Sequence, residues 1–113
     1  MKNIPVVMTF SGHDPSGGAG LQADLETVAA LGCQAVSLVT CLTAQDSRNV
    51  SALYPQPSGH FQRQLELLLD DIQPDMVKIG LLGHVGLADL LADCLQQLDR
   101  PVVLDPVLAA GGG

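Results

Sequence analysis

Apolar and polar positions follow one another along the chain in a pattern that predicts strands alternating with amphipathic helices. Four apolar runs, residues 4–10, 35–40, 76–80 and 102–104, have the length and the β-branched side chains of strands buried on both faces. Between them, apolar residues recur every three or four positions, which is the spacing of one helix face. The apolar faces of three predicted helices consist of Leu21, Leu25, Val28 and Ala29; of Phe61, Leu65, Leu68, Leu69 and Ile72; and of Leu87, Leu90, Leu91, Cys94, Leu95 and Leu98.

Glycine and proline mark where the predicted elements end. Gly32 stands where a helix C-cap glycine would lie, and Pro74 cannot continue the helix that begins near Ser58. Residues 43–59 are polar and rich in turn formers, so we expect a long connection there. Four strands alternating with three helices predict an α/β fold, with three layers (α/β/α) and a mostly parallel sheet.

Length and composition agree with one such domain and exclude several classes of partner. The chain has 113 residues, and its 47% hydrophobic content includes only 3% aromatics, so the interior must consist of Leu, Val, Ile and Ala. A formal net charge of −7 repels phosphate backbones and anionic lipids, which argues against nucleic acid and membrane as partners. No apolar run approaches the roughly 20 residues that span a bilayer. The first residues lack the pattern of a signal peptide, so we expect a cytoplasmic protein.

The three cysteines show neither a disulfide framework nor a metal site. Cys33, Cys41 and Cys94 lie far apart, without a C-x-x-C pair and without a histidine at ligand spacing. Free cysteines usually behave as small buried hydrophobic residues. We therefore expect reduced, mostly buried thiols with a structural role.

Candidate chemistry lies where the predicted strands end. In open α/β sheets, ligands bind outside the carboxyl ends of the strands. Four segments follow those ends, namely residues 11–20, 43–49, 80–84 and 105–113. We expect these segments to meet at one edge of the sheet and to form the ligand site.

The first of these segments is rich in glycine and leads directly into a helix. Gly12, Gly17, Gly18 and Gly20 allow sharp turns and a close approach of the backbone to a ligand, with free N–H groups at the start of the helix. A tight strand-to-helix turn would explain the same glycines without any ligand. The spacing is neither that of a P-loop, which needs Lys and Ser/Thr after its last glycine, nor that of a dinucleotide-binding loop.

Four ordered motifs at the strand ends carry a family resemblance over essentially the whole chain. They are SGHDPSGGAGLQADLETVAALG, TCLTAQDS, VKIGLLG and VVLDPVLAAGGG. Together they resemble the hydroxymethylpyrimidine and phosphomethylpyrimidine kinases of thiamine biosynthesis, members of the ribokinase-like superfamily. Pyridoxal kinases share the D-P-V element, but the paired glycine form is more typical of the pyrimidine kinases. The resemblance implies the N-terminal half of a ribokinase-like fold.

The resemblance implies substrate-binding roles for five residues around an aminopyrimidine, namely Gly12, Asp24, Gln45, Leu81 and Val107. Carboxylate and amide groups can read the ring nitrogens and the amine of such a ligand in a small, partly apolar pocket. Without the resemblance, Asp24 reads as a solvated surface carboxylate. Many family members carry Met where Leu81 stands, which nearly keeps the volume.

The resemblance also places Asp105 near the nucleotide phosphates and Mg²⁺, although an Asp-Pro pair alone would indicate only a turn. Lys78 lies within an apolar strand, where its side chain would extend to solvent or pair with a carboxylate, and no catalytic role is expected for it. His13 reads as a polar loop residue, and His60 and His84 as surface or capping residues.

The implied reaction transfers the γ-phosphoryl group of ATP to the hydroxymethyl group of the pyrimidine, its monophosphate, or both. In this superfamily the catalytic base, the anion hole and most of the adenine pocket belong to the C-terminal half. We therefore expect the base and the anion hole beyond Gly113, and no catalytic residue within residues 1–113.

By the same resemblance, residues 1–113 are expected to be a truncated N-terminal part of the kinase domain. This part should be inactive alone, and the full-length enzyme should be homodimeric. Two alternatives are a pyridoxal or pyridoxine kinase and a non-catalytic, truncated pyrimidine-binding module.

Overall fold

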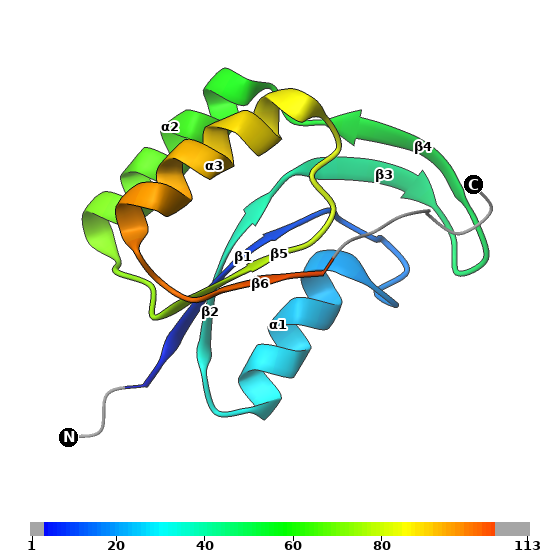
Figure 1. Cartoon of the computed structure of the whole chain (residues 1–113). Helices are drawn as coiled ribbons and strands as arrows, with labels where there is room; N and C mark the ends of the chain where they lie inside the picture. The colour runs from blue at the N-terminus through cyan, green and yellow to red at the C-terminus, as the bar shows by residue number, and fades with distance from the viewer. Residues whose placement is uncertain (1–3, 106–113) are drawn as a thin grey trace.

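The computed structural model describes residues 4–105, which form a three-layer α/β/α arrangement. Its elements are β1 (Val6–Ser11), α1 (Gly20–Ala30), β2 (Gln34–Val39), β3 (Cys41–Gln45), β4 (Val50–Pro55), α2 (Ser58–Asp71), β5 (Met76–Ile79), α3 (Val85–Leu98) and β6 (Val102–Leu104). Four strands form a parallel sheet in the order β2-β1-β5-β6. Helix α1 covers one face of this sheet, and α2 and α3 lie side by side on the other (Figure 1). The predicted fold class and mostly parallel sheet are confirmed.

The alternation of side chains along β1 separates an apolar face of the sheet from a more polar one. Met8 and Phe10 are fully buried and point toward α2 and α3, where the rings of Phe10 and Phe61 lie 5.9 Å apart between centroids. Thr9 and Ser11 face the opposite side, on which α1 packs. The main core lies between the sheet and the pair α2 and α3, because the buried apolar side chains gather on that face. Burial of one large apolar side chain contributes about 1.5–3 kcal/mol. The buried members of this core are Met8, Phe10, Val36, Leu38, Phe61, Leu65, Val77, Ile79, Leu87 and Leu91.

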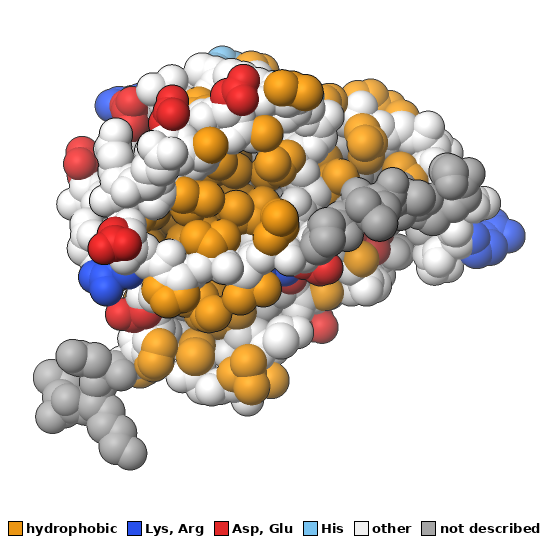
Figure 2. All heavy atoms as spheres, in the orientation of Figure 1, with side chains coloured by type: hydrophobic (Ala, Val, Ile, Leu, Met, Phe, Trp, Pro, Cys, Tyr) orange, Lys and Arg blue, Asp and Glu red, His pale blue; other side chains and the backbone are white. Residues whose placement is uncertain are grey.

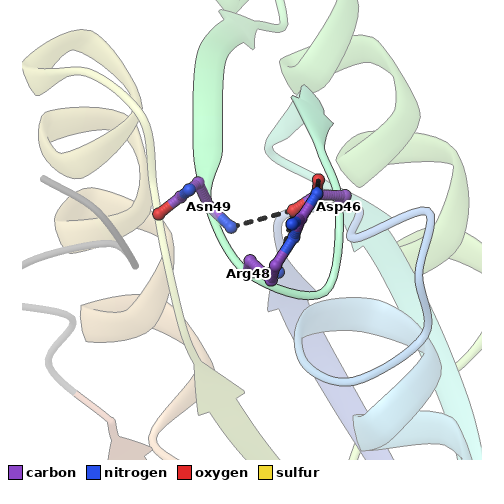
Figure 3. Close-up of polar contacts among 3 residues, drawn as sticks. All are labelled: Asp46, Arg48 and Asn49. Atoms are coloured by element: carbon purple, nitrogen blue, oxygen red, sulfur yellow. Dashed lines mark hydrogen bonds and ion pairs between the residues drawn. The ribbon is translucent and has the colours of Figure 1, made fainter.

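The long connection predicted for residues 43–59 is wrong, because this region contains most of an antiparallel hairpin. Strands β3 and β4 pair with each other and form a second sheet. At the hairpin tip, the Asp46 carboxylate accepts hydrogen bonds from the backbone N–H groups of Arg48, at 2.8 Å, and Asn49, at 3.0 Å (Figure 3). These two strands were hidden by the turn formers at the tip and after β4 and by their own composition, since each mixes polar and apolar residues and lacks the continuous apolar run of a buried strand.

Other boundaries agree with the sequence. Gly32, which directly follows the C-cap residue of α1, has φ +77°, the left-handed conformation expected of a C-cap glycine. All three thiols are free; Cys41 is buried, while Cys33 and Cys94 are partly buried. Burial raises the pKa of the Cys41 and Cys94 thiols. Within residues 4–105, no helix has the length and apolar character needed to cross a lipid bilayer.

Strand β6 forms an edge of the central sheet, and its side chains are largely uncovered. Val102, Val103 and Leu104 keep between 42% and 64% of their surface exposed, although the other three strands of this sheet supply most of the core. Figure 2 shows hydrophobic side chains gathered on this face of the molecule around β6. Strand β6 is therefore an exposed edge of the sheet in the described part of the chain.

Gly20 should tolerate no side chain, because of both its backbone conformation and its neighbour. It begins α1 with φ +63°, and a Cβ atom there would lie 2.3 Å from the carbonyl oxygen of Gly12. We expect Gly20→Ala to destabilise the chain by more than the roughly 1–2 kcal/mol of the left-handed conformation alone. Urea unfolding of the purified chain measures this change.

Gly59→Ala is the matched control. Gly59 lies in the first turn of α2, and a Cβ atom there would meet nothing within 4 Å. Alanine should leave stability unchanged or raise it by up to about 0.5–1 kcal/mol. Equal effects of the two substitutions would contradict the close approach of Gly20 to Gly12.

Candidate active site

A pocket of about 300 Å³ opens where the parallel strands end, beside the β3–β4 hairpin. All four segments that the sequence predicts at this edge contribute to it, the last of them through Asp105. Apolar side chains of the hairpin and of the segment after β5 face the polar residues of the glycine-rich loop. The lining consists of Ser11, Gly12, His13, Asp14, Ala19, Gly20, Thr43, Gln45, Val50, Leu53, Lys78, Gly80, Leu81 and Asp105.

Asp14 organises the glycine-rich loop from within. Its carboxylate accepts hydrogen bonds from the Ser16 backbone N–H at 2.8 Å, from the Ser16 hydroxyl at 2.6 Å and from the Ala19 N–H at 3.0 Å. The hydrogen bond from the Ser16 hydroxyl is the main cause that holds the Asp14 pKa below its usual value, whereas burial raises this pKa. Hydrogen bonds from the Ser16 N–H, the Gln45 side chain and the Ala19 N–H lower the pKa further. Asp14 was not among the residues singled out in the sequence. An Asp two residues before a Ser in a glycine-rich turn is the signal that could have found it, because such carboxylates commonly bond the backbone two residues on.

The loop is also tied to the hairpin and to α1 by backbone hydrogen bonds. The Gly12 carbonyl accepts from Leu21 N–H at 2.9 Å, and His13 N–H donates to the Cys41 carbonyl at 2.9 Å. The Thr43 hydroxyl donates to the His13 carbonyl at 2.7 Å. These bonds fix the loop as one wall of the pocket.

Of the residues given substrate or nucleotide roles by resemblance, four line the pocket. A side chain at Gly12 would be tightly confined, because a Cβ atom would lie 3.1 Å from Cys41 Sγ and 3.3 Å from Leu81 Cδ2. Gln45 ends β3 at an irregularity in the hairpin ladder, and Leu81 follows β5. Asp105 directly follows β6.

Two positions named in the sequence predictions lie outside the described residues. Val107 is the fifth residue to which the resemblance gives a substrate-binding role, and Gly113 is the residue beyond which the catalytic base and the anion hole are expected. The role of Val107 and the location of the catalytic groups beyond Gly113 both stay predictions.

Asp24 occupies a different place from the four residues that line the pocket. It belongs to α1 and lies behind the pocket wall, with only 14% of its side chain exposed, so it is not the solvated carboxylate that its position on a helix suggests. Its Oδ1 accepts from Lys78 Nζ at 2.8 Å, and its Oδ2 accepts from the Ser11 hydroxyl. Ser11 and Lys78 both line the pocket, whereas Asp24 does not. The Asp24 carboxylate therefore holds two side chains of the pocket lining in place.

Lys78 pairs with carboxylates, as one of the two readings of the sequence expected. Besides its contact with Asp24, its Nζ lies 3.8 Å from Asp105 Oδ2. The other expectations for polar residues also agree with their places. His60 is exposed, and His84 caps α3 by accepting from Gly86 N–H at 3.1 Å.

The site fits Mg²⁺ only through a single exposed carboxylate. Among the described residues, no cluster of three or more His, Cys, Asp or Glu side chains forms a cage for a metal ion. Mg²⁺ usually keeps several waters and binds through one or two carboxylates together with substrate phosphates. Asp105 at the pocket rim, with 68% of its side chain exposed, suits that mode of binding.

Comparison with known proteins decides the family. The model of a family described as phosphomethylpyrimidine kinase matches residues 14–113. The chain belongs to the phosphomethylpyrimidine kinase family. The hydroxymethylpyrimidine/phosphomethylpyrimidine kinases of Haemophilus influenzae and Escherichia coli are 41% and 40% identical to it, over 100% of this chain and 42% of each relative. The resemblance carried by the four strand-end motifs is thus confirmed.

Solved structures agree with this assignment to the family. The crystal structure of phosphomethylpyrimidine kinase from Clostridium difficile matches with a TM-score of 0.84 and 35% identity, over 93% of this chain and 48% of that one. Pyridoxal kinase from Staphylococcus aureus in complex with pyridoxal matches with a TM-score of 0.85 and 32% identity, over 96% and 41%. These matches confirm the ribokinase-like α/β fold. The chain spans about two fifths of the length of the two curated kinases that it matches.

The hydrogen bonds to Asp14 should make loop stability depend on pH. A carboxyl whose pKa is lowered by folding stabilises the fold above its unfolded value of about 3.9, and this stabilisation is lost as the pH falls through the folded value. We expect Asp14→Asn to be less stable than the wild type near neutral pH, with the difference shrinking below about pH 4. Urea unfolding over a pH series measures it.

Ser16→Ala provides an internal check, because it removes the hydroxyl that lowers the Asp14 pKa most. This variant should lose part of the same pH-dependent stability. If the difference in the free energy of unfolding between the wild type and Asp14→Asn stays constant down to low pH, the pKa of Asp14 is not lowered by folding.

Proposed function

We propose that the chain is the N-terminal part of a kinase domain that phosphorylates 4-amino-5-hydroxymethyl-2-methylpyrimidine, its monophosphate, or both, in thiamine biosynthesis. The observation that carries the proposal is the meeting of Gly12, Gln45, Leu81 and Asp105 around one pocket at the carboxyl ends of the strands. Membership of the phosphomethylpyrimidine kinase family supports the same substrate class.

The pocket has the chemistry that an aminopyrimidine requires. Gln45 supplies both an amide donor and a carbonyl acceptor, which suit an exocyclic amine and a ring nitrogen. Leu53 and Leu81 supply apolar walls. Gly12 has no side chain and lines the pocket, so its backbone would lie beside the ligand. Asp24 acts from behind the wall through Ser11 and Lys78.

ATP is proposed as the phosphoryl donor and Mg²⁺ as its metal, with Asp105 on the metal side. A pyridoxal kinase with the same fold has been solved in complex with AMP-PCP and pyridoxal, which supports a nucleoside triphosphate site in this family of folds. When bound, Mg²⁺ would neutralise phosphate charge during transfer. The base, the anion hole and most of the adenine pocket are proposed to belong to the part of the relatives that this chain does not match, which would follow Gly113.

Three further proposals accompany the kinase function. The full-length enzyme is proposed to form a homodimer. A cytoplasmic location is supported by the three free thiols, since reducing compartments keep cysteines unpaired. The ligands are proposed to be small molecules rather than nucleic acid or membrane, which the net charge of −7 disfavours.

Pyridoxal kinase is the second candidate, because the TM-score of 0.85 with the pyridoxal-bound enzyme is as high as that with the pyrimidine kinase. A truncated, non-catalytic pyrimidine-binding module is the alternative outside the enzymes. The complete reading frame that contains these residues separates the three possibilities.

The complete reading frame should phosphorylate hydroxymethylpyrimidine with ATP and Mg²⁺ and should prefer it to pyridoxal. Residues 1–113 alone should show no turnover, because they lack the proposed base and anion hole. Coupled ADP release with each substrate measures both results. A strong preference for pyridoxal would refute the pyrimidine as the substrate. Turnover by residues 1–113 alone would refute the proposal that the base and the anion hole lie beyond Gly113.

Gln45→Leu tests the binding role of the amide. The leucine keeps the approximate size of the side chain but removes both hydrogen-bonding groups. We expect kcat/KM for hydroxymethylpyrimidine to fall about 10- to 100-fold, the range for a ligand group left without its partner. Gln62→Leu, at an exposed position on α2, is the control and should leave kcat/KM unchanged. Equal values of kcat/KM for the two variants would show that the Gln45 side chain does not bind the substrate.

A further inference from the structure

Lys78 is a cation in the interior of the sheet that no function has yet explained. It lies on β5, between β1 and β6, and its side chain is only 23% exposed. A buried charge is costly unless it is paired, and Asp24 supplies the pair at 2.8 Å. Within residues 4–105, Lys78 is the only lysine or arginine that lines the pocket.

The two partners of Lys78 differ in how firmly they are held. Asp24 is almost buried, and its second oxygen accepts from the Ser11 hydroxyl, so the carboxylate is held on both sides. Asp105 is 68% exposed and lies 3.8 Å from Lys78 Nζ. Asp24 therefore anchors the ammonium group, and the ammonium group in turn contacts the exposed carboxylate of Asp105.

The backbone of Asp105 is already fixed without Lys78. Its N–H donates to the Ile79 carbonyl at 2.9 Å, which places the residue beside β5 at the pocket rim. What the backbone leaves free is the direction of the carboxylate. Among the described residues, Lys78 is the only side chain that forms an ion pair with it. An exposed pair at this distance is weak, so it can set a preferred direction and still release the carboxylate to a ligand.

We propose that Lys78 is a positioning residue: anchored by Asp24, it directs the Asp105 carboxylate over the pocket for phosphoryl transfer. This proposal rests on the kinase function proposed above. Lys78 acts through Asp105 and takes no part in the bond changes. Lys78 thus connects Asp24 on α1 with Asp105, the residue proposed to lie on the metal side of the site.

The first experiment needs no activity. In the 113-residue chain labelled with ¹³C, the side-chain carboxyl resonance of Asp105 should move in Lys78→Met and stay near its wild-type position in Lys78→Arg. Arg63→Met, at an exposed site on α2, is the charge-matched control and should leave it unchanged. If Lys78→Met alone fails to fold, Lys78→Met with Asp24→Asn removes both buried charges and should show the same movement. An unmoved Asp105 resonance in a folded variant overturns the proposal.

The second experiment uses kinetics of the complete reading frame. Lys78→Met should lower kcat on the order of 10- to 100-fold, as expected when the metal-side carboxylate is misplaced, with a smaller change in the KM for the pyrimidine. Lys78→Arg should recover most of kcat. Adding Lys78→Met to Asp105→Asn should lower kcat little further, because the group through which Lys78 acts is already lost.

If the losses in kcat of the two single variants multiply in the double variant, Lys78 does not act through Asp105. An unchanged kcat in Lys78→Met would refute the positioning role of Lys78. Absence of any phosphorylation by the wild-type reading frame would instead refute the kinase function. The Asp105 resonance would still decide whether Lys78 directs this carboxylate.

Discussion

The parallel pairing of β1 with β2 and β5 is the constraint on which the rest of the structure depends. β1 lies between these two strands, in register from Val6 with Gln34 and from Val7 with Met76. Since all three strands run the same way, their carboxyl ends meet at one edge, and every connection must cross a face of the sheet. The pocket and the three-layer arrangement both follow from this pairing.

The same strands divide the interior into two environments with different tasks. The face toward α2 and α3 is almost wholly apolar and supplies the main core. The face toward α1 carries Ser11 and Lys78 opposite Asp24, so that a charged cluster lies directly behind the pocket wall. One side of the sheet therefore supplies the main core, and the other presents polar groups to the pocket.

Most of the fold could be predicted from the sequence, because the parallel strands are continuous apolar runs and the helices show a clear period. The hairpin was missed, since β3 and β4 mix polar and apolar residues, are mostly not buried and adjoin turn residues that resemble a loop. Among the residues that line the pocket, Gly12, Gln45, Leu81 and Asp105 were singled out in advance because they belong to the strand-end motifs that carry the family resemblance. Asp14 was overlooked although it lies in the same motif, because its importance comes from the N–H groups folded around it.

The sequence alone determined the three helices, the four parallel strands, most of the core and the edge of the sheet where the pocket lies, since each of these follows from apolar runs, local periodicity and the direction of the strands. Only the tertiary structure decided the surroundings of Asp24 and Lys78. These residues are 54 positions apart; Asp24 by itself reads as a surface carboxylate on a helix, and Lys78 as a strand lysine that extends to solvent or pairs with a carboxylate that the sequence does not identify. Their pairing became visible only when α1 packed against β5, because an ion pair depends on distance in space and not on position along the chain.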